Sequence, residues 1–454
     1  MMWSELTDAE RHPLLDAQGA QFLNQLREHP HAPRFNWRIG DRLTREGLAH
    51  VRAYEMELRA AHIGWHAGTL PEWLDEYIAH CFANVPFYRA YGDVPKHFAD
   101  IPTTTRADLA RAPEKFVPDD LPLDDLIFFG STGTTGHHIH VPSHPTSAAK
   151  YISLLRAALA AQGVELRGGA GRVAIANVCF QERTATYAAI LSQLDGSGVV
   201  KINLALSEWN APDDRATYLN ALAPEIITGD PLSFTELMNV PLTFQPRALS
   251  STSMQMTRGL RDALEKHFGC PVVNVYAMTE AGPIAAERAE NVFALLQHRL
   301  YVEILDDAGN VCAPGAYGEI TLTGGMNPYF PLLRYRTSDY ARLEFADDVP
   351  LLADFHGRAP IVFFGENGKR INSADVNRSM REFPVWQFSL HQNADASLVL
   401  RVCNPGAPLE NVRAELLRLF GASQKLDIVQ VNAFPVQEKV VQYTSDILDA
   451  EKRG

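Results

Sequence analysis

Short apolar segments alternate with segments of helical spacing between residues 171 and 278. Four segments are apolar and bounded by Gly, Pro or Asn, as buried strands are: GRVAIANV (171–178), GVVKINL (198–204), PEIITG (224–229) and PVVNVYAM (271–278). Three segments with a helical pattern lie among them: ERTATYAAILSQL (182–194), RATYLNAL (215–222) and TRGLRDALEKHFG (257–269). Strands that alternate with helices form largely parallel sheets, so the pattern predicts an α/β domain.

The regions on either side of this segment have other hydrophobic patterns. Residues 1 to about 95 are mostly helical in pattern, and TSAAKYISLLRAALAAQG (146–163) also has helical spacing. From 298 to 346, strands alternate around Asp-Asp-Ala-Gly-Asn and Pro-Gly turns, which indicates an antiparallel region. After residue 357 the pattern restarts as a small α+β unit. We therefore expect three parts: a helical N-terminal extension (1–75), a large domain (76–356) and a small C-terminal domain (357–454).

The composition narrows the class of protein. The 454-residue chain carries a formal net charge of −13 and has no Lys/Arg cluster, which argues against a nucleic-acid surface. No apolar run approaches the roughly 18 residues of a membrane span, and the mixed acidic and polar N-terminus is unlike a signal peptide. The five cysteines form no CxxC pair, which suits a reducing compartment and gives no metal framework. We expect a cytoplasmic protein without a nucleic-acid or membrane partner.

The stretch FFGSTGTTGHHIH (128–140) concentrates Gly, Ser and Thr. Backbone N–H groups of such a run can converge on an anion, and the hydroxyl groups add donors. The Walker pattern does not fit, because no lysine follows and His137 and His138 stand in its place. His140 and His144 add two more histidines, but no Cys or third ligand is evident. We therefore expect solvated or phosphate-side histidines and no zinc site.

Several short motifs follow one another in a recognisable order. They are NVPFYR (84–89), IPTTTRADLA (101–110), GSTGTTGHH (130–138), VYAMTEAG (275–282), PLLRYRTSDYARL (331–343) and GRAP (357–360). This order resembles the adenylate-forming superfamily of acyl-CoA synthetases, adenylation domains and luciferases, and it is most similar to the phenylacetate-CoA ligase branch. The resemblance runs from about residue 75 to the end. It implies a large α/β domain with mostly parallel sheets and an antiparallel β subdomain, followed by a small mobile α+β domain.

The resemblance implies ATP and Mg²⁺ as ligands and suggests residues for them. The β- and γ-phosphates would be held by the loop residues Ser131, Thr132, Gly133, Thr134, Thr135 and Gly136. Tyr276 would pack by the adenine, Thr279 would contact the α-phosphate, and Glu280 would ligate Mg²⁺. The place of these three residues at the end of a predicted buried strand suits a ligand site there.

Further residues are implied near the boundary of the two domains. Asp339 would accept hydrogen bonds from both ribose hydroxyls, a task for which a carboxylate has two acceptor oxygens. Arg358 would help at the ribose or a phosphate. Lys439 in FPVQEKVVQY would steady the transferring phosphoryl and carboxylate oxygens, with Lys369 as a weaker alternative.

The sequence also departs from the family's motifs. Ser338 replaces the Gly of the RYRTGD motif, and LSSTSMQ (249–255) stands where an adenine-side motif is usual. The hinge GRAPIVFFG (357–365) is about two residues shorter than the family's and lacks its Asp pair, which puts the domain rotation of the superfamily in doubt. His137, if protonated, would supply part of the charge of the missing lysine.

The motifs imply an AMP-forming ligase that converts an acid and ATP to an acyl-adenylate and pyrophosphate. The default acceptor is CoA; an amine, which would give an amide, and a carrier-protein thiol are alternatives. A nucleotide-binding homologue without catalysis is the competing hypothesis. We expect Phe180, Tyr187, Met254 and Ala281 to line the acyl pocket, and the branch suggests an aromatic or similarly compact acid. The oligomeric state is open, with a homodimer as one option.

Overall fold

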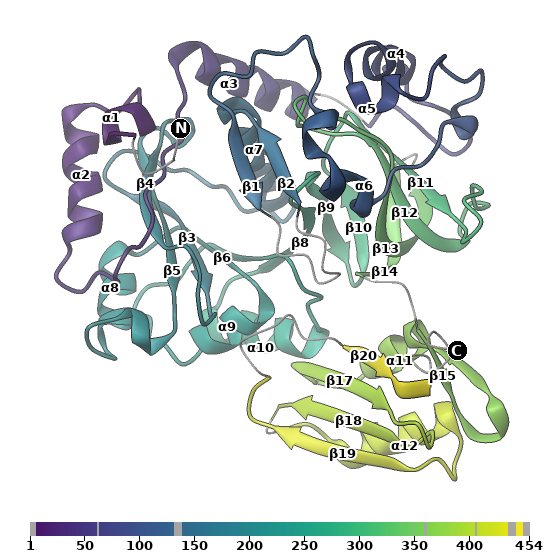
Figure 1. Ribbon diagram of the computed structural model, residues 1–454. Coiled ribbons are helices and arrows are strands. Elements are labelled where there is room, and N and C mark those ends of the chain that lie inside the picture. The colour runs from purple at the N-terminus through teal and green to yellow at the C-terminus, as the bar shows by residue number, and fades with distance from the viewer. Residues whose placement is uncertain are drawn as a thin grey trace.

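One mixed sheet of twelve strands forms the core of the large domain (Figure 1). The structure is a computed structural model, and it describes residues 6–60, 63–130, 139–347, 349–357, 361–404, 406–434 and 442–447. Across the sheet the strand order is β11-β12-β13-β14-β10-β9-β8-β7-β6-β3-β5-β4. The strand bounds are β3 (Val173–Cys179), β4 (Tyr187–Leu191), β5 (Ser197–Asn203), β6 (Ile226–Gly229), β7 (Ala248–Ser251), β8 (Val272–Met278), β9 (Gly282–Ala289), β10 (Val292–Leu295), β11 (Leu300–Leu305), β12 (Tyr317–Gly324), β13 (Leu332–Ala346) and β14 (Val349–His356).

The sheet is parallel in one half and antiparallel in the other. Strands β5, β3, β6 and β7 pair in parallel, and β4 lies antiparallel at the edge. Strand β8 belongs to both halves, because residues 272–274 pair in parallel with β7 and residues 275–278 pair antiparallel with β9. The strands beyond β9 are all antiparallel. The predicted α/β fold with an antiparallel region is confirmed.

Helices pack on both halves of the sheet. They are α1 (Asp8–Arg11), α2 (Ala17–Glu28), α3 (Arg45–Ala60), α4 (Leu74–Asn84), α5 (Pro86–Arg89), α6 (Arg106–Arg111), α7 (Pro145–Ala160), α8 (Asp214–Leu222), α9 (Pro231–Leu237) and α10 (Arg258–Phe268). Helix α7 packs on Ala174 and Ile175 through Leu155 and Leu159, whereas α2, α8, α9 and α10 contribute to a second cluster. The side chains at 23 and 26 of α2 are almost fully buried in that second cluster, so the N-terminal helices complete the core of the large domain.

One segment that we predicted as helical is a strand. Residues 182–194 contain β4 and a short 3₁₀ turn at Ser192–Leu194. Alanine and leucine favour a helix, but the backbone at this sheet edge pairs with β5 over five residues. Pairing also buries Ala188 and Ile190 in the cluster that includes α2. The helical prediction was wrong because this tertiary partner outweighs the local propensity.

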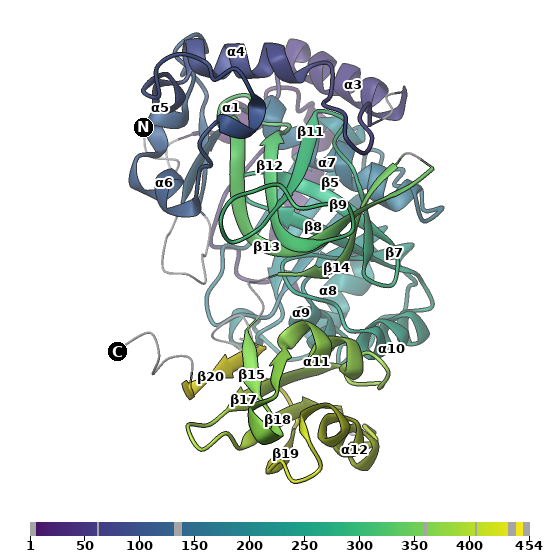
Figure 2. The same ribbon diagram turned by 90° about the vertical axis from the view of Figure 1, so that its right-hand side faces the viewer.

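The small domain contains a four-stranded sheet of order β19-β18-β17-β20. Its elements are β15 (Val362–Phe364), β16 (Arg370–Asn372), α11 (Ser373–Met380), β17 (Gln387–Gln392), β18 (Leu398–Cys403), α12 (Leu409–Phe420), β19 (Leu426–Val431) and β20 (Tyr443–Ser445). Phe363, Leu400 and Phe420 belong to its own hydrophobic cluster. In both views this domain lies below the large one (Figure 2).

The start of α10 contacts the small domain directly. The Thr257 hydroxyl lies 2.7 Å from the carbonyl oxygen of Val385 and 2.8 Å from that of Trp386. A Cβ atom at Gly259 would come within 2.5 Å of the carbonyl carbon of Pro384, so this approach of two backbones requires glycine. In the part of the chain that the structure describes, no helix has both the length and the apolar character to cross a bilayer.

A candidate active site at the turn after strand β8

The motif VYAMTEAG forms the end of β8, a turn and the start of β9. The turn brings Glu280 into the protein, where the residue is 2% exposed, and leaves Thr279 exposed. Gln297 fixes the turn, because its side-chain amide donates to the carbonyl oxygens of Ala281 and Pro283 at 2.8 Å each. The turn is therefore rigidly held, with the Glu280 carboxylate buried and Thr279 exposed to solvent.

The carboxylate of Glu280 is bound through one of its two oxygens. Arg106 Nη1 lies 3.0 Å from Oε1, and the Tyr335 hydroxyl donates to the same oxygen at 2.6 Å. Among the described residues, no hydrogen bond reaches Oε2. Burial, and then the adjacent Glu280 charge, raise the pKa of Tyr335 well above its ordinary value, so the hydroxyl remains a donor at neutral and mildly alkaline pH.

Asp339 on β13 is held by a tyrosine of the other motif. The Tyr276 hydroxyl donates to Asp339 Oδ2 at 2.7 Å. Burial raises the pKa of Tyr276 well above its ordinary value, and the negative charge of Asp339 adds to the effect. The Tyr276 ring is 7% exposed and packs against Phe355 at 4.4 Å between ring centroids. In the structure Tyr276 therefore positions the Asp339 carboxylate. The packing of Tyr276 against adenine stays a prediction.

The two motifs therefore hold each other's carboxylates. VYAMTEAG supplies Tyr276 to Asp339, and RYRTSD supplies Tyr335 to Glu280. About 60 residues separate the members of each pair along the chain. The pairing is possible because β8 and β13 belong to the same sheet.

Strand β13 is fixed by a buried ion pair and by the segment before α6. Arg334 Nε and Nη2 each lie 3.1 Å from an oxygen of Glu303, and its Nη1 donates to the carbonyl oxygens of Ala99 and Ile101. Thr104 pairs with Tyr335 in an isolated bridge. Thr105 then caps α6 in a capping box with Asp108. Arg106 follows the cap directly, and its position opposite Glu280 is a consequence of this anchoring.

Ser338 adopts a backbone conformation that glycine favours. Its φ angle is 64°, in the left-handed region where a Cβ atom is sterically costly. The backbone N–H of Ser338 donates to Glu319 Oε1 at 2.8 Å, which holds the turn in place. This explains physically why a Gly precedes the aspartate in the related motif. A Cβ atom built at Gly357 would lie 3.8 Å from Asp339 Oδ1, so the chain leaves the large domain beside Asp339.

No known protein-family model matches the chain. Among curated proteins, CapK of Staphylococcus aureus is 29% identical over 151 residues, which cover 31% of this chain and 32% of CapK. A phenylacetate-coenzyme A ligase of Aromatoleum evansii is 33% identical over 92 residues, which cover 19% of this chain and 21% of that ligase. The aligned segments thus span a third or less of the lengths of these curated relatives.

Solved structures extend the similarity to most of the chain. A 2-hydroxyisobutyryl-CoA ligase in the postadenylation state with 2-HIB-AMP matches with a TM-score of 0.58 and 16% identity, covering 84% of this chain and 90% of that one. An open conformation of the same ligase with 2-HIB-AMP and CoA matches with a TM-score of 0.51 and 17% identity, covering 82% and 89%. The chain has the fold of the adenylate-forming ligases. The resemblance that the motifs carry is confirmed, and the local similarity to a phenylacetate-coenzyme A ligase supports that branch.

Several residues expected at the site of this ligase fold lie outside the described residues. They are Ser131, Thr132, Gly133, Thr134, Thr135, Gly136, His137, His138, Arg358 and Lys439. Lys369 is described, and its ammonium group donates to the carbonyl oxygen of Leu419 at the end of α12, 2.9 Å away. His144 caps α7, and its ring stacks on Tyr329 at 5.5 Å. The roles of all these residues stay predictions.

The four residues expected to line the acyl pocket lie at the same end of the strands of the large sheet, where β3, β7 and β8 finish. Phe180, Met254 and Ala281 follow β3, β7 and β8, and Tyr187 begins β4 opposite Lys201 near the end of β5. Their packing differs, however. Phe180 packs against the cluster of the parallel half, whereas Ala281 is buried in the cluster of the antiparallel half. The four residues therefore lie at the same end of the strands, but they do not all belong to one hydrophobic cluster.

Sequence reasoning missed two residues that shape the candidate site. Arg106 directly follows the cap residue of α6, and this place in the motif is the signal that could have identified it. Tyr335 carries no such local signal. Only the folded sheet shows that its hydroxyl meets Glu280.

Proposed function

We propose that the chain is an AMP-forming ligase that activates a small carboxylic acid with ATP. A carboxylate oxygen of the acid would attack the α-phosphorus, and the bond from that phosphorus to the oxygen bridging to the β-phosphorus would break. The products are an acyl-adenylate and pyrophosphate. Such a reaction depends on positioning and on charge stabilisation by preorganised groups.

The reciprocal pairing of the two motifs is the observation that carries this proposal. Tyr276 holds Asp339 and Tyr335 holds Glu280, with O···O distances of 2.7 and 2.6 Å. Each carboxylate is thus oriented by a buried donor before any ligand arrives, as preorganised catalysis requires. We propose that Asp339 accepts the ribose hydroxyls of ATP and that the exposed Thr279 hydroxyl donates to an α-phosphate oxygen.

Glu280 fits a role as a Mg²⁺ ligand through its second oxygen. Mg²⁺ in phosphoryl-transfer sites is held by one or two carboxylates together with substrate phosphates and water. Only Oε1 of Glu280 is engaged among the described residues, which leaves Oε2 to a cation. When bound, Mg²⁺ would neutralise charge on the departing pyrophosphate. Arg106 pairs with the other oxygen, Oε1, at 3.0 Å.

CoA is the acceptor that we propose for the acyl group. The fold matches a ligase solved with 2-HIB-AMP and CoA, and a curated phenylacetate-coenzyme A ligase shares a local stretch of sequence. An aromatic or similarly compact acid follows from that second similarity. Transfer to an amine would give an amide instead, and the product distinguishes the two.

Acid-dependent exchange of labelled pyrophosphate into ATP tests the activation step. We expect exchange with at least one acid of an aromatic and aliphatic panel, and a loss of about 100-fold or more in Glu280→Gln and Asp339→Asn. Glu236→Gln is the matched control, because Glu236 also pairs with an arginine, Arg215 at 2.6 Å, away from the site. Exchange absent with every acid, in protein that still binds ATP, would identify a nucleotide-binding protein without this activity. Mass spectrometry of products with CoA or mixed amines then identifies the acceptor.

A further inference from the structure

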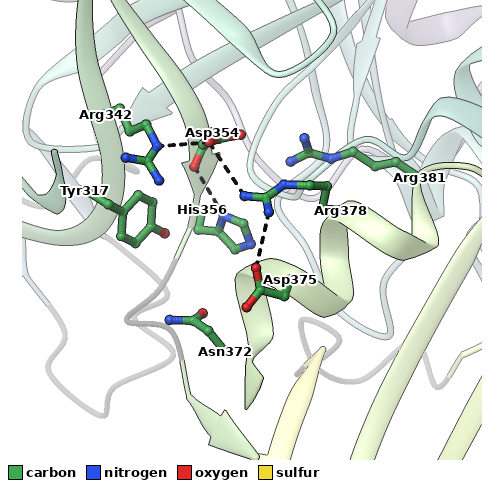
Figure 3. A pocket seen from close by; sticks show the side chains of 8 residues that line it. All are labelled: Tyr317, Arg342, Asp354, His356, Asn372, Asp375, Arg378 and Arg381. Carbon is green, nitrogen blue, oxygen red and sulfur yellow. Dashed lines mark hydrogen bonds and ion pairs between the residues drawn. The ribbon is translucent and has the colours of Figure 1, made fainter. Parts of the chain in front are cut away.

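A cavity of about 190 Å³ lies between the antiparallel half of the large sheet and helix α11 of the small domain (Figure 3). Tyr317, Arg342 and Asp354 line it from β12, β13 and β14. Arg378 and Arg381 line it from α11 and the residue after it. The cavity therefore takes its charged side chains from both domains.

Both carboxylates of the cavity are already paired with arginines. Arg342 Nε lies 3.0 Å from Asp354 Oδ2, and Arg378 Nη2 lies 3.9 Å from the same oxygen. Arg378 Nη1 also lies 3.2 Å from Asp375 Oδ1. The backbone of Asp354 has a φ angle of 50°, a left-handed conformation that is uncommon for a non-glycine residue inside a strand. These contacts account for two of the three guanidinium groups.

The third guanidinium, that of Arg381, has no carboxylate partner among the described residues. No described Asp or Glu oxygen lies within 4.0 Å of it, and its nearest described partner is the neutral amide of Asn291, whose oxygen accepts from Nη2 once the amide is oriented to suit its neighbours. Burial lowers the pKa of Arg381, with Asp354 and more distant carboxylates opposing the effect. A partly buried cation that no carboxylate contacts directly is energetically costly, and an anion in contact with it would relieve that cost.

Tyr317 adds a donor without an acceptor. Its hydroxyl oxygen is buried and has no hydrogen-bond partner in the described part of the chain. The ring is fixed from two sides, with the Arg342 guanidinium 5.7 Å from its centroid and the Tyr340 ring at 6.1 Å. Buried hydroxyl groups are almost always hydrogen-bonded, so this one points to a missing acceptor.

The lining also has an excess of positive charge. Among the described lining residues, three arginines face two aspartates, and burial lowers the pKa of His356, which keeps its ring neutral at neutral pH. Pockets for drug-sized ligands are usually about 300–1,000 Å³, so this cavity is too small to enclose a nucleotide. Its volume suits an oxyanion with a few water molecules.

We propose that this cavity is a binding site for a phosphate-class oxyanion, with Arg381 and Arg378 as counter-charges and Tyr317 as a hydroxyl donor. The anion is inorganic phosphate or pyrophosphate, or the phosphate group of a larger ligand whose remainder stays outside. Because the three residues come from two domains, the bound anion joins β12 to α11. It stabilises this arrangement of the domains by its binding free energy.

Isothermal titration of the full chain with inorganic phosphate, pyrophosphate and adenosine 3′,5′-bisphosphate tests the site without any acid or ATP. We expect millimolar or tighter binding of at least one probe, weakened about tenfold in Arg381→Gln and severalfold in Tyr317→Phe. Arg418→Gln is the control, because Arg418 is an exposed arginine of the same domain that pairs with Glu415 on α12. Tighter binding of the bisphosphate than of the inorganic anions would identify the phosphate of a larger ligand as the occupant.

Two results would overturn the proposal. One is the absence of binding of all three probes at millimolar concentration. The other is equal affinity of the wild type and Arg381→Gln, which would place the anion elsewhere, for example at the proposed ATP site. If Arg381→Gln does not fold, as judged by circular dichroism, Tyr317→Phe and Arg378→Gln decide the question by the same criterion. Failure here would leave the pyrophosphate exchange of the proposed ligase unaffected.

Discussion

Two buried carboxylates of the large domain, Glu303 and Glu280, each face an arginine, but their surroundings differ. Glu303 binds Arg334 through both oxygens, at 3.1 Å each, and the two side chains are 2% and 3% exposed. Glu280 binds Arg106 through one oxygen, at 3.0 Å, and the Arg106 side chain is 19% exposed. Among the described residues, Tyr335 is the other partner of Glu280, and it uses the same oxygen.

The difference separates a structural ion pair from a candidate ligand site. In the Glu303 pair every carboxylate oxygen is engaged, so a ligand could enter only by breaking the pair. The Glu280 pair leaves one oxygen unengaged at the turn after β8. Burial alone therefore does not distinguish a functional carboxylate from a structural one. A better criterion is whether one of its oxygens is left without a hydrogen-bond partner from the described residues.

Breaking the pair of Arg334 and Glu303 should have the largest effect on stability. Replacing Arg334 by Met leaves the buried Glu303 carboxylate without its counter-charge, which costs about 3–5 kcal/mol of unfolding free energy. Burial already raises the pKa of Glu303 despite the arginine, so the carboxylate is poorly solvated. Urea denaturation followed by circular dichroism measures the loss. A cost below that of Arg106→Gln would contradict the distinction between the two pairs.

Breaking the pair of Arg106 and Glu280 should have a smaller effect on stability, and it should change the Mg²⁺ requirement of the reaction. Arg106→Gln should cost about 1–3 kcal/mol, because Tyr335 still donates to Glu280. Removal of the nearby positive charge should also lower the Mg²⁺ concentration needed for half-maximal pyrophosphate exchange. Arg111→Gln, an exposed arginine of the same helix, is the control. An unchanged Mg²⁺ requirement would show that Glu280 does not bind the cation.

Removing one hydroxyl group from the reciprocal pairing should act on ATP binding. Tyr276→Phe deletes the donor to Asp339 and should cost about 1 kcal/mol of stability. Because the carboxylate loses its fixed orientation, we expect the KM for ATP to rise severalfold while the KM for the acid stays unchanged. Steady-state exchange kinetics measure both constants. A rise in both, or in neither, would argue against a ribose contact by Asp339.

The smallest effect should come from relaxing the strand that carries Arg334 and Tyr335. Ser338→Gly removes the steric cost of a Cβ atom at a φ angle of 64°, which is about 1–2 kcal/mol. The more flexible unfolded chain offsets about 0.4–1 kcal/mol of this gain. A net stabilisation below about 1 kcal/mol is expected in thermal denaturation. Destabilisation would mean that contacts of the serine side chain outweigh the backbone strain.

The sequence predicted those parts of the molecule that local patterns determine. The strands predicted at 171–178 and 271–278 depend on nearby residues and are confirmed. Residues 182–194 were mistaken for a helix because their strand conformation depends on β5. The antiparallel region was recognised from its turn residues.

The candidate site was predictable only in part. The motifs named Glu280 and Asp339, but the tyrosine that holds each of them comes from the other motif. Such a contact depends on the register of strands far apart in the sequence, which no local pattern encodes. The anion cavity depends likewise on side chains from two domains, and none of its arginines belongs to a cluster in the sequence.

The division of β8 between two sheet halves has a consequence for insertions and deletions. Its first three residues are aligned with β7, and its last four are aligned with β9. One residue inserted between these parts would turn every later side chain of the strand to the opposite face. Tyr276 would then point away from Asp339, although no site residue had been replaced. The length of this strand is as much a part of the proposed chemistry as the identity of its residues.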